Sequence, residues 1–142
     1  MFLRDDDGTF DAPVEAVWRF LGDGPRHSEA HRHTEVVREL QSDHEGTYSW
    51  VQPFDGHPTR FTMHWRSFAP LGIVYEVRVG PFEGSRFFLY YAPVGERTRV
   101  AIVGEFESPS LAGAELEDAV RRFFALEFEQ DRAAIESGTR GR

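Results

Sequence analysis

The sequence predicts an α+β fold, in which a curved antiparallel sheet of about six or seven strands wraps around one long C-terminal helix. Three observations support this prediction. A short amphipathic helical pattern occupies residues 11–21, strand-like segments follow one another from 34 to 107, and a second, longer helical pattern runs from about 111 to 136. This order of elements indicates a single domain over residues 1–142.

Two short helices are expected after a first strand at residues 2–10. Asp11 is a suitable N-cap for the first helix, and Pro13 fits its first turn, where no intrahelical donor is lost. The helical spacing gives that helix one apolar face, formed by Val14, Val17, Trp18 and Leu21. Pro25 prevents the first helix from continuing, and the polar residues 26–33 have room for one or two further turns.

The segment from 34 to 107 has the pattern of an antiparallel meander. Gly- and Pro-containing turn signals recur roughly every dozen residues, and apolar and charged residues alternate between them. One face of the sheet is therefore apolar and the other faces water. The predicted apolar positions are Phe61, Met63, Trp65, Ile73, Tyr75, Val77, Val79, Phe87, Leu89, Tyr91, Val100, Ile102 and Phe106.

The C-terminal helix is expected to cover that apolar face. It is roughly 35–40 Å long at 1.5 Å per residue, which is enough to cross the sheet. Its apolar stripe consists of Leu116, Val120, Phe123, Phe124, Phe128 and Ile135. Because a curved sheet and a straight helix leave room between them, and 14% of the residues are aromatic, we expect a cavity lined by rings.

Composition excludes several other classes of function. The net charge of −8 disfavours binding to nucleic acid or to an anionic membrane surface. The chain has no cysteine, no secretory signal at its start and no apolar run long enough for membrane insertion, so a cytoplasmic protein is expected. No catalytic triad order, phosphate-binding glycine loop or dinucleotide fingerprint is present, and no cofactor is predicted.

The run from Phe10 to Asp23, which reads FDAPVEAVWRFLGD, resembles the opening of the START/polyketide-cyclase/pollen-allergen (SRPBCC) superfamily. The resemblance extends over the full length, because the helix pair, the strand meander and the long final helix follow in the family's order. It implies a helix-grip fold. It also implies binding of a lipid, sterol, quinone, polyketide or plant hormone, and in a minority of members cyclisation or dehydration. The family has no shared catalytic residue to transfer to this chain.

The leading functional prediction is binding of a small hydrophobic or aromatic molecule, such as a lipid, polyketide or quinone-like compound, between the sheet and the C-terminal helix. The predicted lining is Trp50, Phe61, Met63, Trp65, Tyr75, Phe87, Leu89, Tyr91, Val120, Phe123, Phe124 and Glu127. Glu127 is the polar member, since Glu127 and Asp131 fall within the apolar stripe. There Glu127 either points into the cavity, as an acid, base or hydrogen-bond partner, or pairs with an arginine at its margin.

Two alternatives to a carrier remain open. The first is a polyketide cyclase or dehydratase that uses Glu127 with a tyrosine, Tyr75 or Tyr91, as an acid–base pair. The second is a protein-interaction or chaperone-regulator module, whose interior would be filled by its own side chains. The sequence is compatible with a monomer or a homodimer.

A metal site is not expected. His27 and His31 would share a helical face and His33 lies close to them, but zinc needs a third ligand. The candidates considered, Glu29, Glu35 and His57, match no known ligand spacing.

Overall fold

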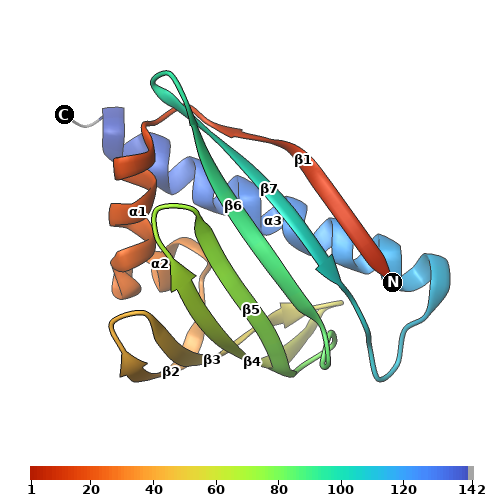
Figure 1. The fold of residues 1–142 in the computed structure, drawn as a ribbon. Helices are drawn as coiled ribbons and strands as arrows, with labels where there is room; N and C mark the ends of the chain where they lie inside the picture. The colour runs from red at the N-terminus through yellow and green to blue at the C-terminus, as the bar shows by residue number, and fades with distance from the viewer. Residues whose placement is uncertain (141–142) are drawn as a thin grey trace.

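The computed structural model describes residues 1–140, without the side chains of residues 4–7 and 139–140. Seven strands and three helices make up the fold of these residues (Figure 1). In chain order they are β1 (Phe2–Phe10), α1 (Val14–Gly22), α2 (Gly24–Ala30), β2 (Thr34–Ser42), β3 (Glu45–Phe54), β4 (His57–Phe68), β5 (Gly72–Val79), β6 (Arg86–Val94), β7 (Arg97–Glu105) and α3 (Gly113–Arg140).

The strands form one antiparallel sheet in the order β1-β7-β6-β5-β4-β3-β2. Each strand from β2 to β6 pairs with the next strand in the chain, and β1 forms the edge of the sheet beside β7. Figure 1 shows α3 crossing one face of the curved sheet, with α1 and α2 packed at one end. This is the helix-grip fold, with the two short helices after the first strand, as the sequence predicts.

The helix boundaries differ from the prediction at two points. Asp11 is not the N-cap of α1: that position is Pro13, which makes no side-chain cap, and the Asp11 backbone N–H instead donates to Glu136 Oε1 at 3.0 Å. This hydrogen bond holds the residues just before α1 against the C-terminal part of α3. Helix α3 begins at Gly113, two residues later than expected, and runs four residues beyond the expected end at Glu136, to Arg140. Residues 141–142 lie outside the described part of the chain.

Two apolar clusters divide the interior between the sheet and the helices. The larger lies between strands β3 to β7 and the first half of α3, around the fully buried Phe61 and Val120. The smaller joins α1 to the end of α3 and contains Phe10, Val17 and Phe20. The long helix therefore contacts both ends of the molecule, and its middle turns lie where the clusters meet.

The β3–β4 hairpin places one rim of the interior beside α3. Its two turn residues, Asp55 and Gly56, have φ values of 50° and 79°. Positive φ at both central positions is the geometry of the tight turn whose twist matches a hairpin, and Gly adopts it without steric cost. The exposed Asp55 carboxylate lies 3.9 Å from Arg122 on α3.

Candidate functional site

Aromatic rings fill much of the larger cluster. The ring of Phe61 stacks between Trp50 and Phe123, with centroid distances of 5.3 and 5.5 Å. Phe123 also meets Phe82 and Phe124 edge to face, at 5.5 and 5.3 Å. This part of the interior is occupied by the protein's own side chains, at contact distances typical of well-packed aromatic pairs.

Most of the residues predicted to line a cavity meet in this cluster, and three do not. Those that meet are Trp50, Phe61, Met63, Tyr75, Phe87, Leu89, Val120, Phe123 and Phe124. Tyr91 belongs to the smaller cluster, where its ring meets Trp18 of α1 at 5.6 Å. The half-buried Trp65 packs over Gly46, because a glycine on the neighbouring strand leaves space for its ring. Glu127 faces α2, where its carboxylate approaches His31.

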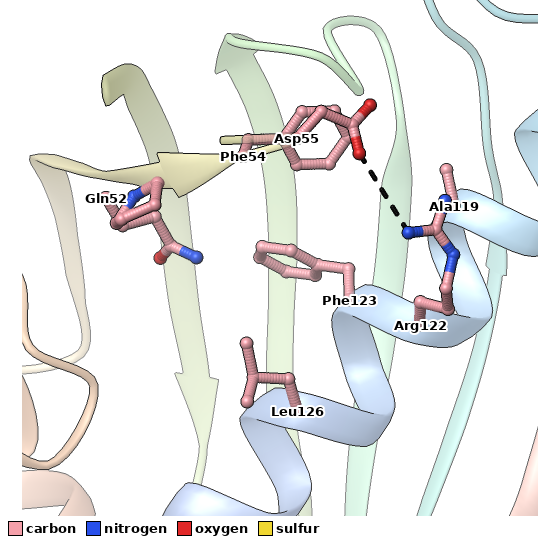
Figure 2. A pocket seen from close by; sticks show the side chains of 8 residues that line it. Gln52, Phe54, Asp55, Ala119, Arg122, Phe123 and Leu126 are labelled. Atoms are coloured by element: carbon pink, nitrogen blue, oxygen red, sulfur yellow. Dashed lines mark ion pairs between the residues drawn. The ribbon is translucent and has the colours of Figure 1, made fainter. Parts of the chain in front are cut away.

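A pocket of about 140 Å³ opens beside the ring stack, between the β3–β4 hairpin and α3 (Figure 2). Its walls are Gln52, Pro53, Phe54, Asp55, Ala119, Arg122, Phe123 and Leu126. Figure 2 shows the Asp55–Arg122 ion pair at one side of it. Of the predicted lining residues only Phe123 borders this pocket, so its location was not foreseen.

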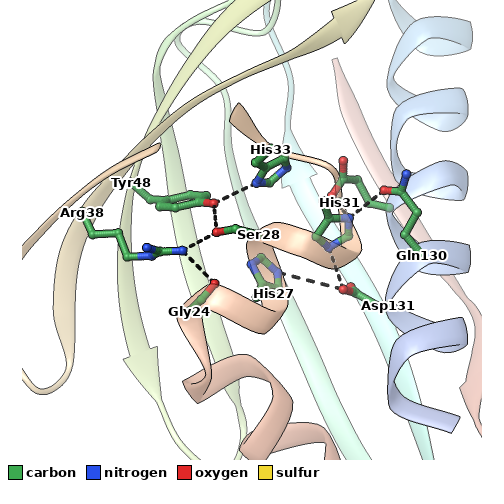
Figure 3. Close-up of polar contacts among 10 residues, drawn as sticks. Gly24, His27, Ser28, His31, His33, Arg38, Tyr48, Gln130 and Asp131 are labelled. Atoms are coloured by element: carbon green, nitrogen blue, oxygen red, sulfur yellow. Dashed lines mark hydrogen bonds and ion pairs between the residues drawn. The ribbon is translucent and has the colours of Figure 1, made fainter. Parts of the chain in front are cut away.

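A polar cluster lies further along α3, where α2 packs against it (Figure 3). At its centre is His31, whose side chain is 1% exposed. Its Nε2 lies 2.7 Å from Asp131 Oδ1, and its Nδ1 lies 2.7 Å from Gln130 Oε1 and 3.0 Å from Glu127 Oε2. All three partners accept hydrogen bonds, so His31 donates from both ring nitrogens and is an imidazolium.

The electrostatics of the cluster agree with that assignment. Burial alone would lower the pKa of His31, but its hydrogen bonds to Asp131 and Glu127, and the charges of both carboxylates, raise it to about 11. Burial, reinforced by the positive charge of His31, lowers the pKa of His27 and of His33 to about 3. One charged imidazole is thus flanked by two neutral ones.

His33 connects this polar cluster to the aromatic interior. Its imidazole stacks on Trp50 with centroids 4.6 Å apart, and its Nδ1 lies 2.8 Å from Tyr48 Oη. The Tyr48 hydroxyl in turn lies 2.6 Å from Ser28 Oγ, which accepts a hydrogen bond from Arg38. These bonds hold the ring of His33 in a fixed orientation against the wall of the interior.

Two buried polar atoms of the cluster have no hydrogen-bond partner, namely His33 Nε2 and Glu127 Oε1. A buried polar group without a partner costs roughly 1–3 kcal/mol, so each is a position where a bound group would be stabilised. The two atoms belong to residues whose side chains also approach His31. Among the described side chains, they mark this junction as the candidate functional site.

Sequence reasoning found only part of this site. The helical wheel correctly placed Glu127 and Asp131 inside the apolar stripe, but the partner of Glu127 is His31 and not an arginine. The third group beside His27 and His31 is Asp131 of α3, rather than Glu29, Glu35 or His57. The sequence did contain a signal for this site: carboxylates on the buried face of one predicted helix, and several histidines in and after another.

Comparison with known proteins places the chain in a family. The model of the family described as "Polyketide cyclase / dehydrase and lipid transport" matches residues 6–136. The chain belongs to that family. This membership confirms the resemblance to the START/polyketide-cyclase/pollen-allergen superfamily. Among curated proteins, no sequence matches significantly.

Several solved structures share the fold. A START superfamily protein from Mycobacterium smegmatis is 10% identical, with a TM-score of 0.80 over 96% of this chain and 97% of that one. The Zhui aromatase/cyclase from Streptomyces sp. R1128 is 16% identical, with a TM-score of 0.74 over 100% and 96%. The protein TTHA0849 from Thermus thermophilus is 16% identical, with a TM-score of 0.76 over 97% and 99%.

At these identities the likeness establishes the fold alone. Family membership supports a broad role in binding hydrophobic ligands or in polyketide cyclisation. Of the helices among the described residues, none has the length and apolarity that a membrane crossing requires.

Proposed function

We propose that this polyketide cyclase/dehydrase-family protein binds one small hydrophobic or aromatic molecule that carries a hydroxyl or carbonyl group, such as a polyketide, quinone-like compound or lipid. The apolar body lies against the aromatic wall between the sheet and α3. Its polar group is held by His33 Nε2 and Glu127 Oε1. The observation that carries the proposal is that neither buried atom has a hydrogen-bond partner of good geometry among the described side chains, although the Gln52 amide approaches His33.

The two atoms suit a hydroxyl group in particular. A hydroxyl accepts one hydrogen bond and donates another. When Tyr48 donates to Nδ1 of His33, Nε2 carries the proton and donates to the ligand oxygen, while the Glu127 carboxylate accepts the ligand's hydrogen. A ligand that satisfies both atoms removes two desolvation penalties of roughly 1–3 kcal/mol each.

In this proposal the ligand enters through the pocket, whose wall is in contact with the side chains that lead to this position. Gln52 lines the pocket, and its Oε1 accepts the indole N–H of Trp50 at 2.7 Å. Trp50 then stacks on His33, so two side-chain contacts link the pocket wall to the polar cluster. Sites for drug-sized ligands measure about 300–1,000 Å³, against about 140 Å³ here. A full-sized ligand must therefore displace Phe123 and the half-exposed Leu126.

The proposal is tested by comparing 2-naphthol with naphthalene in chelator-containing buffer, following tryptophan fluorescence. Wild-type protein should bind 2-naphthol about tenfold more tightly, the equivalent of one net hydrogen bond. His33→Phe keeps the ring on Trp50 but removes Nε2, and should bring the ratio of the two dissociation constants close to one. Glu127→Ala removes the carboxylate acceptor and should also bring that ratio close to one.

The matched control is Glu129→Ala, because Glu129 is exposed on the same helix and pairs with Arg132. It should leave both affinities unchanged. Thermal unfolding of each variant confirms that it is folded. Equal affinities of the wild type for the two compounds, or no saturable binding of either, would overturn the proposed function.

A second candidate is an aldol cyclase on the same site. Glu127 would take a proton from a methylene carbon of a poly-β-ketone, that carbon would attack a ketone of the same chain, and Tyr75 would protonate the alkoxide. Water would leave in a later dehydration. The supporting observation is that Tyr75 is near the cluster: burial, and then the charges of Asp131 and Glu127, raise its pKa. Cyclisation of a synthetic poly-β-ketone, followed by the ring product's absorbance and lost in Tyr75→Phe, tests this role.

A further inference from the structure

We propose that His31, His33 and Glu127 bind one divalent transition-metal ion of the zinc type at the junction of α2 and α3. Each residue offers one ligand atom, and these atoms all lie within 4.8 Å of one another. Tetrahedral zinc with bonds near 2.0–2.1 Å places its ligand atoms about 3.3 Å apart. Small rotations of the three side chains therefore suffice to close the site. The inference goes beyond the proposed function and does not require an organic ligand.

The two histidines are already oriented as metal ligands are. A metal-bound histidine almost always donates its other ring N–H to a carboxylate, carbonyl or similar group, which fixes the ring and its tautomer. For His31 that group is Asp131, 2.7 Å from Nε2. For His33 it is the Tyr48 hydroxyl, 2.8 Å from Nδ1, in the tautomer in which His33 is the donor; organic-ligand binding as proposed above uses the other tautomer. These bonds leave Nδ1 of His31 and Nε2 of His33 for the ion.

The unpartnered atoms are the second observation. His33 Nε2 and Glu127 Oε1 are both buried and both without a partner, and they are among the atoms that an ion would engage. Gln130 Oε1, at 2.7 Å from His31 Nδ1, supplies a further oxygen next to the same position. When the ion binds, the Nδ1 proton of His31 leaves to solvent, and the amide oxygen is free to coordinate.

Charge also favours a cation at this position. Two carboxylates, Glu127 and Asp131, contact the positively charged His31 directly, and the other cation of the cluster, Arg38, lies on the far side of Ser28 and Tyr48. When a divalent ion replaces the Nδ1 proton of His31, the positive charge that balances the two carboxylates increases by one. Imidazole nitrogen with carboxylate oxygen is a ligand set suited to zinc, cobalt, nickel or iron rather than to magnesium or calcium.

A second grouping shares His31 but is less suitable. His27, His31 and Asp131 also place their ligand atoms within 4.8 Å. In that set Asp131 Oδ1 is already bonded to His31 Nε2, and His27 Nε2 is 3.9 Å from the same oxygen. An ion there would break the bond that orients His31. The structure therefore favours the set that contains His33.

Cobalt provides the test, because Co²⁺ in a tetrahedral nitrogen–oxygen site absorbs visible light. Chelator-treated protein is dialysed, titrated with Co²⁺, and then competed with Zn²⁺. We expect one equivalent of Co²⁺ to produce the absorption and one equivalent of Zn²⁺ to abolish it. His33→Phe and Glu127→Ala should weaken binding at least about tenfold, and Tyr48→Phe by about tenfold through the orientation of His33.

The matched control is His57→Phe, since His57 is an exposed histidine on β4, away from α2. It should bind like the wild type. Absence of saturable Co²⁺ and Zn²⁺ binding by the wild type overturns the inference, and this result does not depend on whether any variant folds. Unaltered binding by both His33→Phe and Glu127→Ala, or loss confined to His27→Phe, overturns the ligand assignment. The naphthol titration is done with chelator present. Failure of naphthol binding therefore does not affect the metal proposal, and failure of metal binding does not affect the proposed function.

Discussion

The imidazole of His33 lies flat on the indole of Trp50, with ring centroids 4.6 Å apart and planes inclined by 22°. This contact joins the two halves of the candidate site. On one side of it Trp50 continues into a stack of apolar rings, and on the other His33 presents an unpartnered nitrogen to a charged cluster. The proposed function places a ligand with an apolar body and one polar group at this boundary.

Phe123→Ala should make the protein less stable and yet a better binder of naphthalene. The ring lines the pocket and contacts Phe61 and Phe82, so its removal enlarges an apolar space. Loss of a buried phenylalanine costs about 3–5 kcal/mol, and an apolar cavity accepts an apolar guest. Urea unfolding and a naphthalene titration measure the two effects.

Phe68→Ala is the control for that variant, because Phe68 is 46% exposed on the far part of β4. Its unfolding free energy and its affinity for naphthalene should both stay close to the wild type. If Phe123→Ala binds naphthalene no better than Phe68→Ala does, the pocket is not part of the ligand's path.

His31→Ala should strongly destabilise the fold in chelator-containing buffer. His31 ties α2 to α3 through Asp131, Glu127 and Gln130, and its removal leaves two carboxylates without their buried cation. Breaking a buried ion pair in this way costs about 3–5 kcal/mol. The free energy of unfolding, measured in urea, should fall by that amount.

The comparison variant is Arg121→Ala, which removes an exposed pair with Glu117 on the same helix. Such pairs contribute about 0.3–0.5 kcal/mol. Similar losses in the two variants would mean that His31 is not a tether between the helices.

Gly46→Ala should displace Trp65. A Cβ built at Gly46 would lie 2.8 Å from both the Glu39 carbonyl oxygen and the Trp65 ring, and the backbone atom cannot move aside cheaply. Overpacking of this kind costs about 1–3 kcal/mol. Near-ultraviolet circular dichroism should change with the tryptophan environment.

Gly22→Ala is the matching glycine variant, since a Cβ there has nothing within 4 Å. It should leave both stability and the dichroism spectrum near those of the wild type. A Gly46→Ala protein with an unchanged spectrum would show that the Trp65 ring does not depend on the glycine.

The fold was predictable because its signals are local. Alternation in β4 and β5, the apolar stripe of α3 and the turn residues each depend on neighbours a few positions away. The α1 cap was predicted wrongly because Asp11 has tertiary partners: its backbone N–H donates to Glu136, 125 residues along the chain, and its carboxylate lies 3.5 Å from Arg97 Nε. A cap preference of about 1 kcal/mol gives way readily to such a contact.

The site was predictable only in its α3 half. Periodicity placed Glu127 and Asp131 on the buried face, but it carries no information about what packs there. His31 and Asp131 are 100 residues apart, so their contact depends on how α2 docks against α3. Likewise, the Trp65 and Tyr91 rings share the apolar face of the sheet with the rest, but their positions along it place them outside the main cluster.

A crystal structure of the wild-type protein soaked with 2-naphthol would show whether a ligand reaches the junction of α2 and α3. We expect the hydroxyl oxygen within hydrogen-bond distance of His33 Nε2 and Glu127 Oε1, the fused rings against Trp50, and Phe123 and Leu126 moved from their present positions. Density for the compound only on the exposed surface, or an interior unchanged at saturating concentration, would contradict this expectation.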